Sequence, residues 1–295
     1  MQKYSYYPGC TLKSKATELD NGGRKSAEIL GFELEEIPDF QCCGGVYPLS
    51  KDETAQKLGA VRALKYASEH NQKLVTLCSA CYNVLKLVNN DFKDPSSTQI
   101  KNKINTYLKL NKTDYDNGLP YNGDAKVVHY LEVLRDDIGF EKISEKVKTK
   151  INKKIAAYYG CLLLRPSKIL KFDDPENPSI LEDFIKSVGG DAVKYSLRNE
   201  CCGSYGSLEN NVSETTEDGI CCGTKSSYVK SQTIKALPQS VKIIRDAVSN
   251  GAEMIITACP LCMYNLQKAA DYVKDADGKN IEIKYFTEIL FEALK

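Results

Sequence analysis

A cysteine pair with CxxC spacing follows a short apolar run at two places in this chain. The two stretches are Thr76-Leu77-Cys78-Ser79-Ala80-Cys81-Tyr82-Asn83 and Thr257-Ala258-Cys259-Pro260-Leu261-Cys262-Met263-Tyr264-Asn265. Both begin with threonine at the end of the run, and both close on Tyr-Asn. The shared flanks indicate an internal duplication, which has to be recognised before the fold is predicted.

Other cysteines repeat in the same order ahead of each CxxC. Each half opens with one cysteine after an aromatic run, in Tyr6-Tyr7-Pro8-Gly9-Cys10 and in Tyr158-Tyr159-Gly160-Cys161. An adjacent pair followed by glycine comes next, in Cys42-Cys43-Gly44 and in Cys201-Cys202-Gly203. A single cysteine, a pair and a CxxC therefore occur twice, which extends the duplication over most of the chain.

The second half contains two candidates for the adjacent pair. Cys43 lies 35 positions before Cys78, whereas Cys202 lies 57 positions before Cys259. The longer gap contains a second pair, Cys221-Cys222-Gly223, whose distance to the CxxC would match the first half better. Spacing alone therefore leaves the choice open.

We favour Cys201 and Cys202 as the pair equivalent to the one in the first half. They follow a predicted strand, as the first pair does. The segment Glu209–Gly219 is rich in Asn, Ser, Thr and acidic residues, which is typical of an inserted polar loop. We therefore expect an insertion near residues 206–225 that carries Cys221 and Cys222.

The apolar periodicity predicts an α/β fold with mostly parallel sheets. Eight short apolar or β-branched runs are predicted to be strands: Lys3–Tyr7, Phe32–Ile37, Lys73–Leu77, Ala125–Val128, Lys154–Tyr159, Ala192–Ser196, Met254–Thr257 and Ile281–Tyr285. Helical patterns lie between them, for example at Glu53–His70 and at Gln239–Asn250. Ligands of such sheets gather beyond the carboxyl ends of the strands, where all of these cysteine motifs begin. Five thiols per half should therefore converge at one edge of a sheet.

Composition excludes several classes of protein. With 40 basic and 39 acidic residues the net charge is +1, which argues against a nucleic-acid binder. No apolar run approaches the ~20 residues that span a bilayer. The polar start lacks an apolar signal core, so we expect a cytoplasmic protein. Twelve cysteines against two histidines and no tryptophan are the unusual feature.

Several uses of these thiols can be compared on their chemistry. Structural disulfides are disfavoured, because adjacent cysteines bridge each other only with strain and a reducing compartment would not keep them. A thioredoxin-like dithiol would explain one CxxC, but neither the pairs nor the single cysteines. A zinc site usually takes two CxxC knuckles per ion. An iron–sulfur cluster uses five thiolates more naturally, although the compact spacing of a ferredoxin is absent.

This constellation resembles the cysteine-rich CCG domain family, and over the whole chain it is similar to the B-type subunits of heterodisulfide reductase. The resemblance is carried by the two cysteine patterns and by Pro8-Gly9-Cys10, Asn199-Glu200-Cys201-Cys202-Gly203 and Ala258-Cys259-Pro260-Leu261-Cys262. It implies two Rossmann-like CCG subdomains related by a pseudo-twofold axis. We place them at residues 1–122 and 123–295.

The resemblance further implies two non-cubane 4Fe–4S clusters, each held by five cysteines. The first set is Cys10, Cys42, Cys43, Cys78 and Cys81. The second set is Cys161, Cys201, Cys202, Cys259 and Cys262, with Cys221 and Cys222 as alternatives for the pair. Such clusters are expected to cleave a small-molecule disulfide, such as that between coenzymes M and B, to two thiols.

No nucleotide or flavin site is recognisable in the sequence. Gly22-Gly23-Arg24-Lys25-Ser26 lacks the spacing of a phosphate-binding loop, and no G-x-G-x-x-G follows a strand. Electrons should therefore arrive from other subunits. The family's partners are a ferredoxin-like iron–sulfur protein of the C type and a bifurcating flavoprotein of the A type. The alternative is an electron-relay component of a larger membrane- or flavin-linked oxidoreductase, with no disulfide substrate.

Four charged or titratable side chains are further candidates. His129, at the end of a predicted strand, could protonate a leaving thiolate or orient substrate. It could equally be a hydrogen-bonded interior histidine. His70, near a helix end, is most simply a surface residue that interacts with the helix dipole. Lys13 and Arg165 follow Cys10 and Cys161 at similar offsets, and are either anion-binding residues or solvated loop charges.

Overall fold

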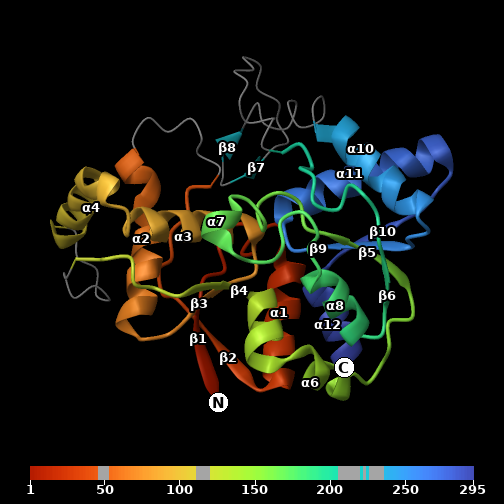
Figure 1. Cartoon of the computed structure of the whole chain (residues 1–295), viewed down its shortest axis with the longest axis horizontal. Coiled ribbons are helices and arrows are strands. Elements are labelled where there is room, and N and C mark those ends of the chain that lie inside the picture. Colours follow the sequence, from red (N-terminus) through yellow and green to blue (C-terminus); the bar gives the residue numbers. More distant parts are fainter. Residues whose placement is uncertain (46–52, 111–119, 205–219, 222–223, 226–235) are drawn as a thin grey trace.

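The computed structural model describes residues 1–45, 53–110, 120–204, 220–221, 224–225 and 236–295. Its strands form two four-stranded parallel sheets and a two-stranded antiparallel hairpin (Figure 1). The strands are β1 (Gln2–Tyr6), β2 (Phe32–Glu36), β3 (Leu74–Thr76), β4 (Val127–His129), β5 (Lys154–Tyr158), β6 (Asp191–Val193), β7 (Ile220–Cys221), β8 (Thr224–Lys225), β9 (Met254–Thr257) and β10 (Glu282–Tyr285). Each of the eight predicted strands is present, and the predicted α/β class is confirmed.

The two sheets have the same topology. The first has the order β2-β1-β3-β4, and the second read in the matching direction has the order β6-β5-β9-β10. The middle strands β3 and β9 are buried along their whole length. That burial on both faces explains their continuous apolar sequence, because parallel strands between two helical layers have no solvent side. The duplication seen in the cysteines is therefore a duplication of the fold.

Helices connect the strands and cover the sheets. They are α1 (Thr17–Leu30), α2 (Glu53–Glu69), α3 (Ser79–Asp91), α4 (Thr98–Leu110), α5 (Tyr130–Glu132), α6 (Phe140–Lys146), α7 (Ser167–Leu170), α8 (Ile180–Ser187), α10 (Leu237–Ser249), α11 (Pro260–Asp277) and α12 (Phe286–Leu294). A π-helix, η2 (Val133–Ile138), follows α5, and a short 3-10 helix, η1 (Pro95–Ser97), precedes α4. The two predicted helices correspond to α2 and α10.

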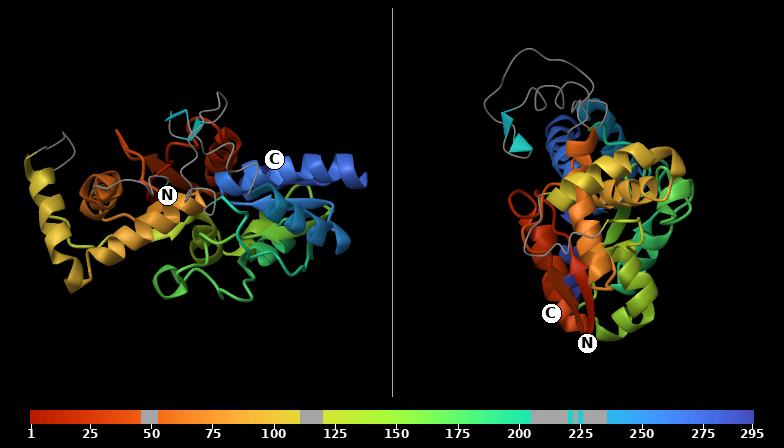
Figure 2. Two further views of the ribbon diagram at one scale, coloured as in Figure 1. Left: turned by 90° about the horizontal axis from the view of Figure 1, so that it is seen from above. Right: turned by 90° about the vertical axis from the view of Figure 1, so that its left-hand side faces the viewer.

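A helix that follows the last strand of each sheet packs against the other half, so neither half packs independently of the other. Helix α12 follows the last strand of the second sheet but packs against α1 of the first half, as Figure 1 shows. Thr287 Oγ1 donates a hydrogen bond to the Leu19 carbonyl across this contact, at 2.9 Å. In return α6 packs against α8 of the second half, where the rings of Phe140 and Phe184 meet. The outer helices α4 and α11 lie toward opposite ends of the molecule (Figure 2).

The Gly22-Gly23 pair has a packing role in α1. A Cβ on Gly22 would lie 2.7 Å from the Thr287 carbonyl oxygen of α12, and one on Gly23 would lie 2.2 Å from a Leu77 methyl group. Two neighbours therefore approach the α1 backbone more closely than any side chain would allow. This explains the glycines whose spacing did not match a phosphate-binding loop.

The expected division of the chain near residue 122 does not follow the sheets. Strand β4 lies beyond that boundary but pairs with β3, with Thr76 opposite His129. The first sheet therefore extends to His129. The sequence around residue 122 could not show this, because β4 joins the first sheet through its pairing with the distant strand β3. The expected insertion near residues 206–225 lies mostly outside the described residues, which include only the β7–β8 hairpin from it.

Candidate metal centre

The cysteine motifs lie where three strands of each sheet end. The strands of each sheet run in register, so that Tyr6 pairs with Val75 and Tyr158 pairs with Thr257. Loops that leave β1, β2 and β3 therefore start at the same edge, and the loops after β5, β6 and β9 do the same. This arrangement carries five cysteines to one edge of each sheet, as the sequence predicted.

The five thiols of the first half form a row of contacts. Cys10 Sγ lies 3.7 Å from Cys42 Sγ, and Cys43 Sγ lies 3.6 Å from Cys81 Sγ. Cys43 also contacts Cys42, and its contacts with Cys42 and Cys81 lower its pKa. Cys81 also contacts Cys78, and its contacts with Cys43 and Cys78 raise its pKa. The row thus runs from the single cysteine through the pair to the CxxC.

The second half repeats this row in the same order. Cys161 contacts Cys201, which contacts Cys202. Cys202 contacts Cys262, which contacts Cys259. The pattern of burial also matches, because the single cysteine and the first of the pair are partly exposed in both rows while the other three are buried. The ten cysteines of the two rows carry no disulfide.

A tyrosine in each half identifies which pair is equivalent. The Tyr7 hydroxyl donates to the carbonyl of Gln41, the residue just before Cys42. The Tyr158 hydroxyl donates to the carbonyl of Glu200, just before Cys201, at 2.8 Å. Burial raises the pKa of both tyrosines well above its usual value, so both hydroxyls keep the proton they donate.

These tyrosines were not singled out from the sequence, although the aromatic run before each single cysteine was the signal that could have identified them. Their matched hydrogen bonds support Cys201 and Cys202 as counterparts of the first pair. Cys221 lies in β7 of the hairpin, and Cys222 lies outside the described residues.

Glycines before the two single cysteines make room for the CxxC thiols. Gly9 and Gly160 have φ angles of 75° and 63°, in the left-handed region that favours glycine. A Cβ on Gly9 would lie 2.7 Å from Cys81 Sγ, and one on Gly160 would lie 3.1 Å from Cys262 Sγ. The backbone itself is therefore part of the wall around each row.

A backbone hydrogen bond joins the two CxxC loops. Ser79 N–H in the first half donates to the carbonyl of Ala258 in the second, at 3.2 Å. The symmetric bond cannot form, because the residue equivalent to Ser79 is Pro260, which has no N–H. The Leu77 carbonyl, which would have accepted it, instead accepts from His129 Nε2 at 3.0 Å. The two rows are therefore neighbours, and their junction is asymmetric.

A side chain reinforces this junction. The Asn83 amide on α3 donates to the carbonyls of Leu162 and Arg165 at 2.9 and 2.7 Å. Both acceptors belong to the loop that follows Cys161. The first CxxC helix thus holds the second half's single-cysteine loop. In the sequence, the signal that could have pointed to Asn83 was the Tyr-Asn pair that ends each CxxC motif.

His129 lies behind the first CxxC loop, among aromatic rings. Its side chain is fully buried, Nδ1 accepts from Leu131 N–H at 3.2 Å, and Nε2 holds the Leu77 carbonyl. Burial lowers the pKa of His129 to about 3, so the ring is neutral. Tyr82 and Phe172 meet it edge-on. These surroundings fit the interior-histidine interpretation, in which His129 positions the loop.

The two candidate anion-binding side chains have partners within the chain. Lys13 Nζ lies 2.7 Å from a Glu36 carboxylate oxygen. Arg165 donates to the Asn199 carbonyl at 3.1 Å and lies 3.2 Å from Glu176. Arg165 thus ties the loop after Cys161 to the segment before Cys201. His70 is exposed at the end of α2, where it stacks on Tyr66.

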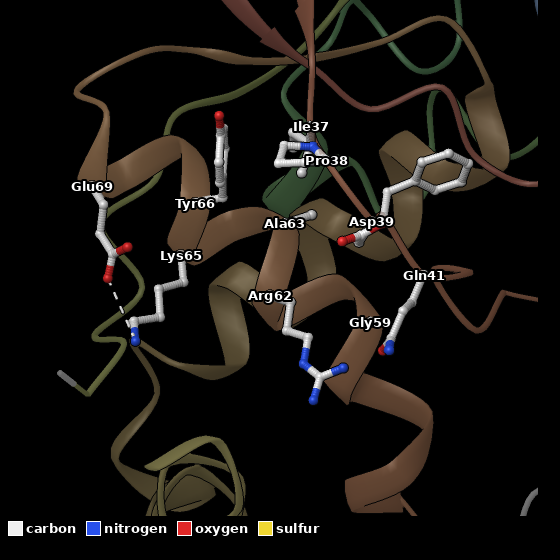
Figure 3. Close-up of a pocket in the computed structure, with 11 residues that line it drawn as sticks. Ile37, Pro38, Asp39, Gln41, Gly59, Arg62, Ala63, Lys65, Tyr66 and Glu69 are labelled. Atoms are coloured by element: carbon white, nitrogen blue, oxygen red, sulfur yellow. Dashed lines mark ion pairs between the residues drawn. The ribbon is translucent and has the colours of Figure 1, made fainter. Parts of the chain in front are cut away.

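A surface pocket of about 100 Å³ lies between α2 and the segment that leads to Cys42 (Figure 3). It is bounded by the segment Ile37–Gln41 and by α2, including Arg62 and the ion pair of Lys65 with Glu69. Gly59 lies in its wall, in close contact with the Cys42 carbonyl. All its lining residues belong to the first half, so this pocket is separate from the junction of the two rows.

Comparisons with known proteins identify the class. The family model of the cysteine-rich domain called CCG matches residues 4–86 and 207–267. Two segments of the chain therefore match the cysteine-rich CCG domain, as the sequence predicted. The second match includes Cys221 and Cys222 and begins after Cys202, whereas the geometry pairs Cys201 and Cys202 with the first half.

Three curated proteins are similar to this chain over most of their length. The chain is 25% identical to the B subunit of the ferredoxin:CoB-CoM heterodisulfide reductase of Methanosarcina mazei, over 100% of this chain and 90% of that protein. It is 27% identical to an Archaeoglobus profundus protein described as similar to the B subunit of heterodisulfide reductase, over 96% and 87%. It is 29% identical to the 8-methylmenaquinol:fumarate reductase membrane anchor subunit of Wolinella succinogenes, over 90% and 82%.

A solved structure shares the fold. It is that of a hypothetical protein from Helicobacter pylori, with a TM-score of 0.65 and 14% identity, covering 99% of this chain and 49% of that one. This likeness concerns the fold alone. Within the described ranges of our chain, no helix has the length and apolar content needed to cross a membrane.

The donor set of each row fits a cluster of several irons. Thiolates are ligands that soft metals and iron–sulfur clusters prefer. Among the described residues, no three His, Cys, Asp or Glu side chains close around one point as the ligands of a single ion do. Each row instead brings five thiols together through successive contacts, and thiolates are the ligands by which iron–sulfur clusters are held.

Proposed function

We propose that this chain is the catalytic iron–sulfur subunit of a heterodisulfide reductase-type complex. It would hold two non-cubane 4Fe–4S clusters and reduce a small-molecule disulfide to two thiols. The observation that carries the proposal is the pair of matched five-thiol rows whose CxxC loops are joined by the Ser79–Ala258 hydrogen bond. The full-length similarity to heterodisulfide reductase B subunits supports it.

The buried and the partly exposed cysteines of each row would have different roles. The CxxC thiols and the second cysteine of each pair are buried, so they anchor the group from below. Cys10 and Cys42, like Cys161 and Cys201, are partly exposed, so a substrate would approach from their side. The bound clusters would supply one electron each, which is the number that each half of a disulfide requires when it becomes a thiolate.

The remaining residues of the site position these ligands. Tyr7 and Tyr158 hold the carbonyls before the two pairs, and Asn83 fixes the loop of one half on the other. His129 holds the Leu77 carbonyl from the buried side, so we assign it a positioning role instead of proton transfer to substrate. A proton for the product thiolate would then come from solvent at the open side of the rows.

We further propose that electrons arrive from partner subunits. A ferredoxin-like iron–sulfur protein of the C type and a flavoprotein of the A type are the partners that the resemblance implies, in a cytoplasmic complex. The isolated chain should not oxidise NADH with a disulfide, whereas a reduced low-potential dye should drive the reaction directly.

The second candidate is a relay subunit that passes electrons without meeting a disulfide. The similarity to the Wolinella succinogenes anchor subunit of a quinol:fumarate reductase favours it specifically. The described pocket on α2 is not the cavity between the two rows that a disulfide would need. Turnover distinguishes the candidates, because a relay would accept electrons from the dye but would not cleave the disulfide.

The test begins with metal content. Anaerobically prepared protein should contain about eight irons and eight labile sulfides per chain, as two 4Fe–4S clusters require. Cys201→Ser should lose about half of the iron, and Cys221→Ser, the matched control from the alternative pair, should retain it. Stoichiometric zinc without labile sulfide would refute the clusters, and the reverse result for the two variants would refute the ligand assignment. Dye-driven cleavage of the coenzyme M–coenzyme B disulfide then tests the substrate.

A further inference from the structure

The two rows differ at one matched position on the helix behind them. Counted from the last cysteine of each CxxC, Asn265 lies three residues after Cys262, and Val84 lies three residues after Cys81. Asn83 is therefore not the counterpart of Asn265. One residue rotates a side chain by about 100° around a helix, which explains why Asn83 contacts the other half while Asn265 does not.

In the second row, polar groups surround the second cysteine of the pair. The Asn265 amide donates to Cys202 Sγ at 3.4 Å and to the Ser204 hydroxyl oxygen at 2.5 Å. The Ser204 hydroxyl oxygen lies 3.4 Å from the same sulfur. A thiolate at Cys202 can only accept hydrogen bonds, and the Ser204 hydroxyl lies within donating distance of it. Asn265 and Cys202 are both buried, so water does not screen these contacts strongly.

In the first row the same two positions are apolar. Gly45 stands where the second half has Ser204, and Val84 stands where it has Asn265. A Cβ on Gly45 would lie 3.1 Å from a Val84 methyl group and 3.6 Å from Cys43 Sγ, so the position equivalent to Ser204 lies beside both groups. Backbone N–H groups also donate to sulfurs in both rows, from Gly45 to Cys43 in the first, and from Gly203 to Cys201 and from Leu261 and Cys262 to Cys259 in the second. Among the described residues, the side-chain donors at the second cysteine of the pair therefore belong to the second row, while the first row has one hydroxyl contact elsewhere, between Thr11 Oγ1 and Cys10 Sγ at 3.8 Å.

We infer that Asn265 and Ser204 give the second row a higher reduction potential than the first. The inference rests on the proposed function, since it concerns clusters bound by these thiols. Reduction adds negative charge to a cluster and its thiolates, and hydrogen bonds to the sulfurs stabilise that charge. A first electron entering the pair would leave the first row oxidised and come to rest on the second. No bond forms or breaks in this step, and only one electron moves.

The chain offers matched variants that exchange the two environments. Asn265→Val removes the donor from the second row, and Val84→Asn introduces one into the first. Val84 is partly exposed, so its replacement by a polar residue of similar size should not prevent folding. Each variant is prepared anaerobically with its clusters and titrated electrochemically, with electron paramagnetic resonance as the readout. Cys10→Ser and Cys161→Ser, which each lack a ligand of one row, assign the two signals.

The expected result is a higher potential for the second row in the unmodified chain. One hydrogen bond to a charged acceptor changes such an equilibrium about tenfold, which corresponds to about 59 mV for one electron. Asn265→Val should lower the second potential by about this amount, and Val84→Asn should raise the first. Equal potentials, or potentials that neither variant moves, would overturn the inference while leaving the clusters in place. Protein without iron and labile sulfide would instead overturn the proposed function itself.

Discussion

His129 should make the stability of the protein depend on pH between about 5 and 7. Burial lowers its pKa from 6.5 to about 3 in the folded chain. Between these values the unfolded chain binds a proton that the folded chain does not, so stability falls as the pH falls below 6.5. From pH 7 to pH 5 this proton uptake costs about 2 kcal/mol of unfolding free energy, and the loss continues down to about pH 3.

The test compares the unmodified chain with His129→Asn. An asparagine oxygen can still cap α5 by accepting from Leu131 N–H, but the Leu77 carbonyl loses its donor, so the variant should be about 1–3 kcal/mol less stable at pH 7. Because asparagine does not titrate, the difference between the two proteins should shrink by about 2 kcal/mol at pH 5. Urea unfolding under anaerobic, reducing conditions at both pH values measures this change.

The control is His70→Asn, which removes the other histidine of the chain, at an exposed position. It should leave the pH-dependent contribution of His129 in place. If the unmodified chain and His129→Asn lose equal stability between pH 7 and pH 5, then His129 does not titrate as a buried neutral ring, and the reasoning is refuted.

Two further predictions concern the junction and the walls of the rows. Asn83→Ala should cost about 1–3 kcal/mol of unfolding free energy and lower the iron content of the second row, because two carbonyls of the other half lose their donor. Asn89→Ala, which removes buried hydrogen bonds within the first half, should lower stability alone; equal iron loss in both variants would contradict this account. Gly9→Ala should reduce bound iron, because its Cβ would lie 2.7 Å from Cys81 Sγ. Gly31→Ala, also at positive φ but with open space around it, should retain the iron and lose about 1 kcal/mol; full iron content in Gly9→Ala would refute the contact.

The duplication, the eight strands and the edge at which the thiols gather could all be predicted from the amino-acid sequence. These features depend on contiguous motifs and on local periodicity. A run such as Met254–Thr257 is apolar at every position but the last because both of its faces are buried. The cysteines follow such runs directly, so parallel pairing of the strands was sufficient to bring the motifs to one edge.

The differences between the two halves, and the way in which they pack together, could not be predicted before the fold was known. The assignment of β4 to the first sheet and the packing of α12 on α1 depend on contacts between distant segments. The roles of His129 and Asn83 could not be predicted, because a shift of one residue along a helix or strand changes the direction of a side chain. A sequence motif does not show which direction the side chain takes. Two differences between equivalent positions could be interpreted only when the halves were matched in space. Pro260 stands where the first half has Ser79 and removes a backbone donor, and Asn265 stands where it has Val84 and adds a side-chain donor.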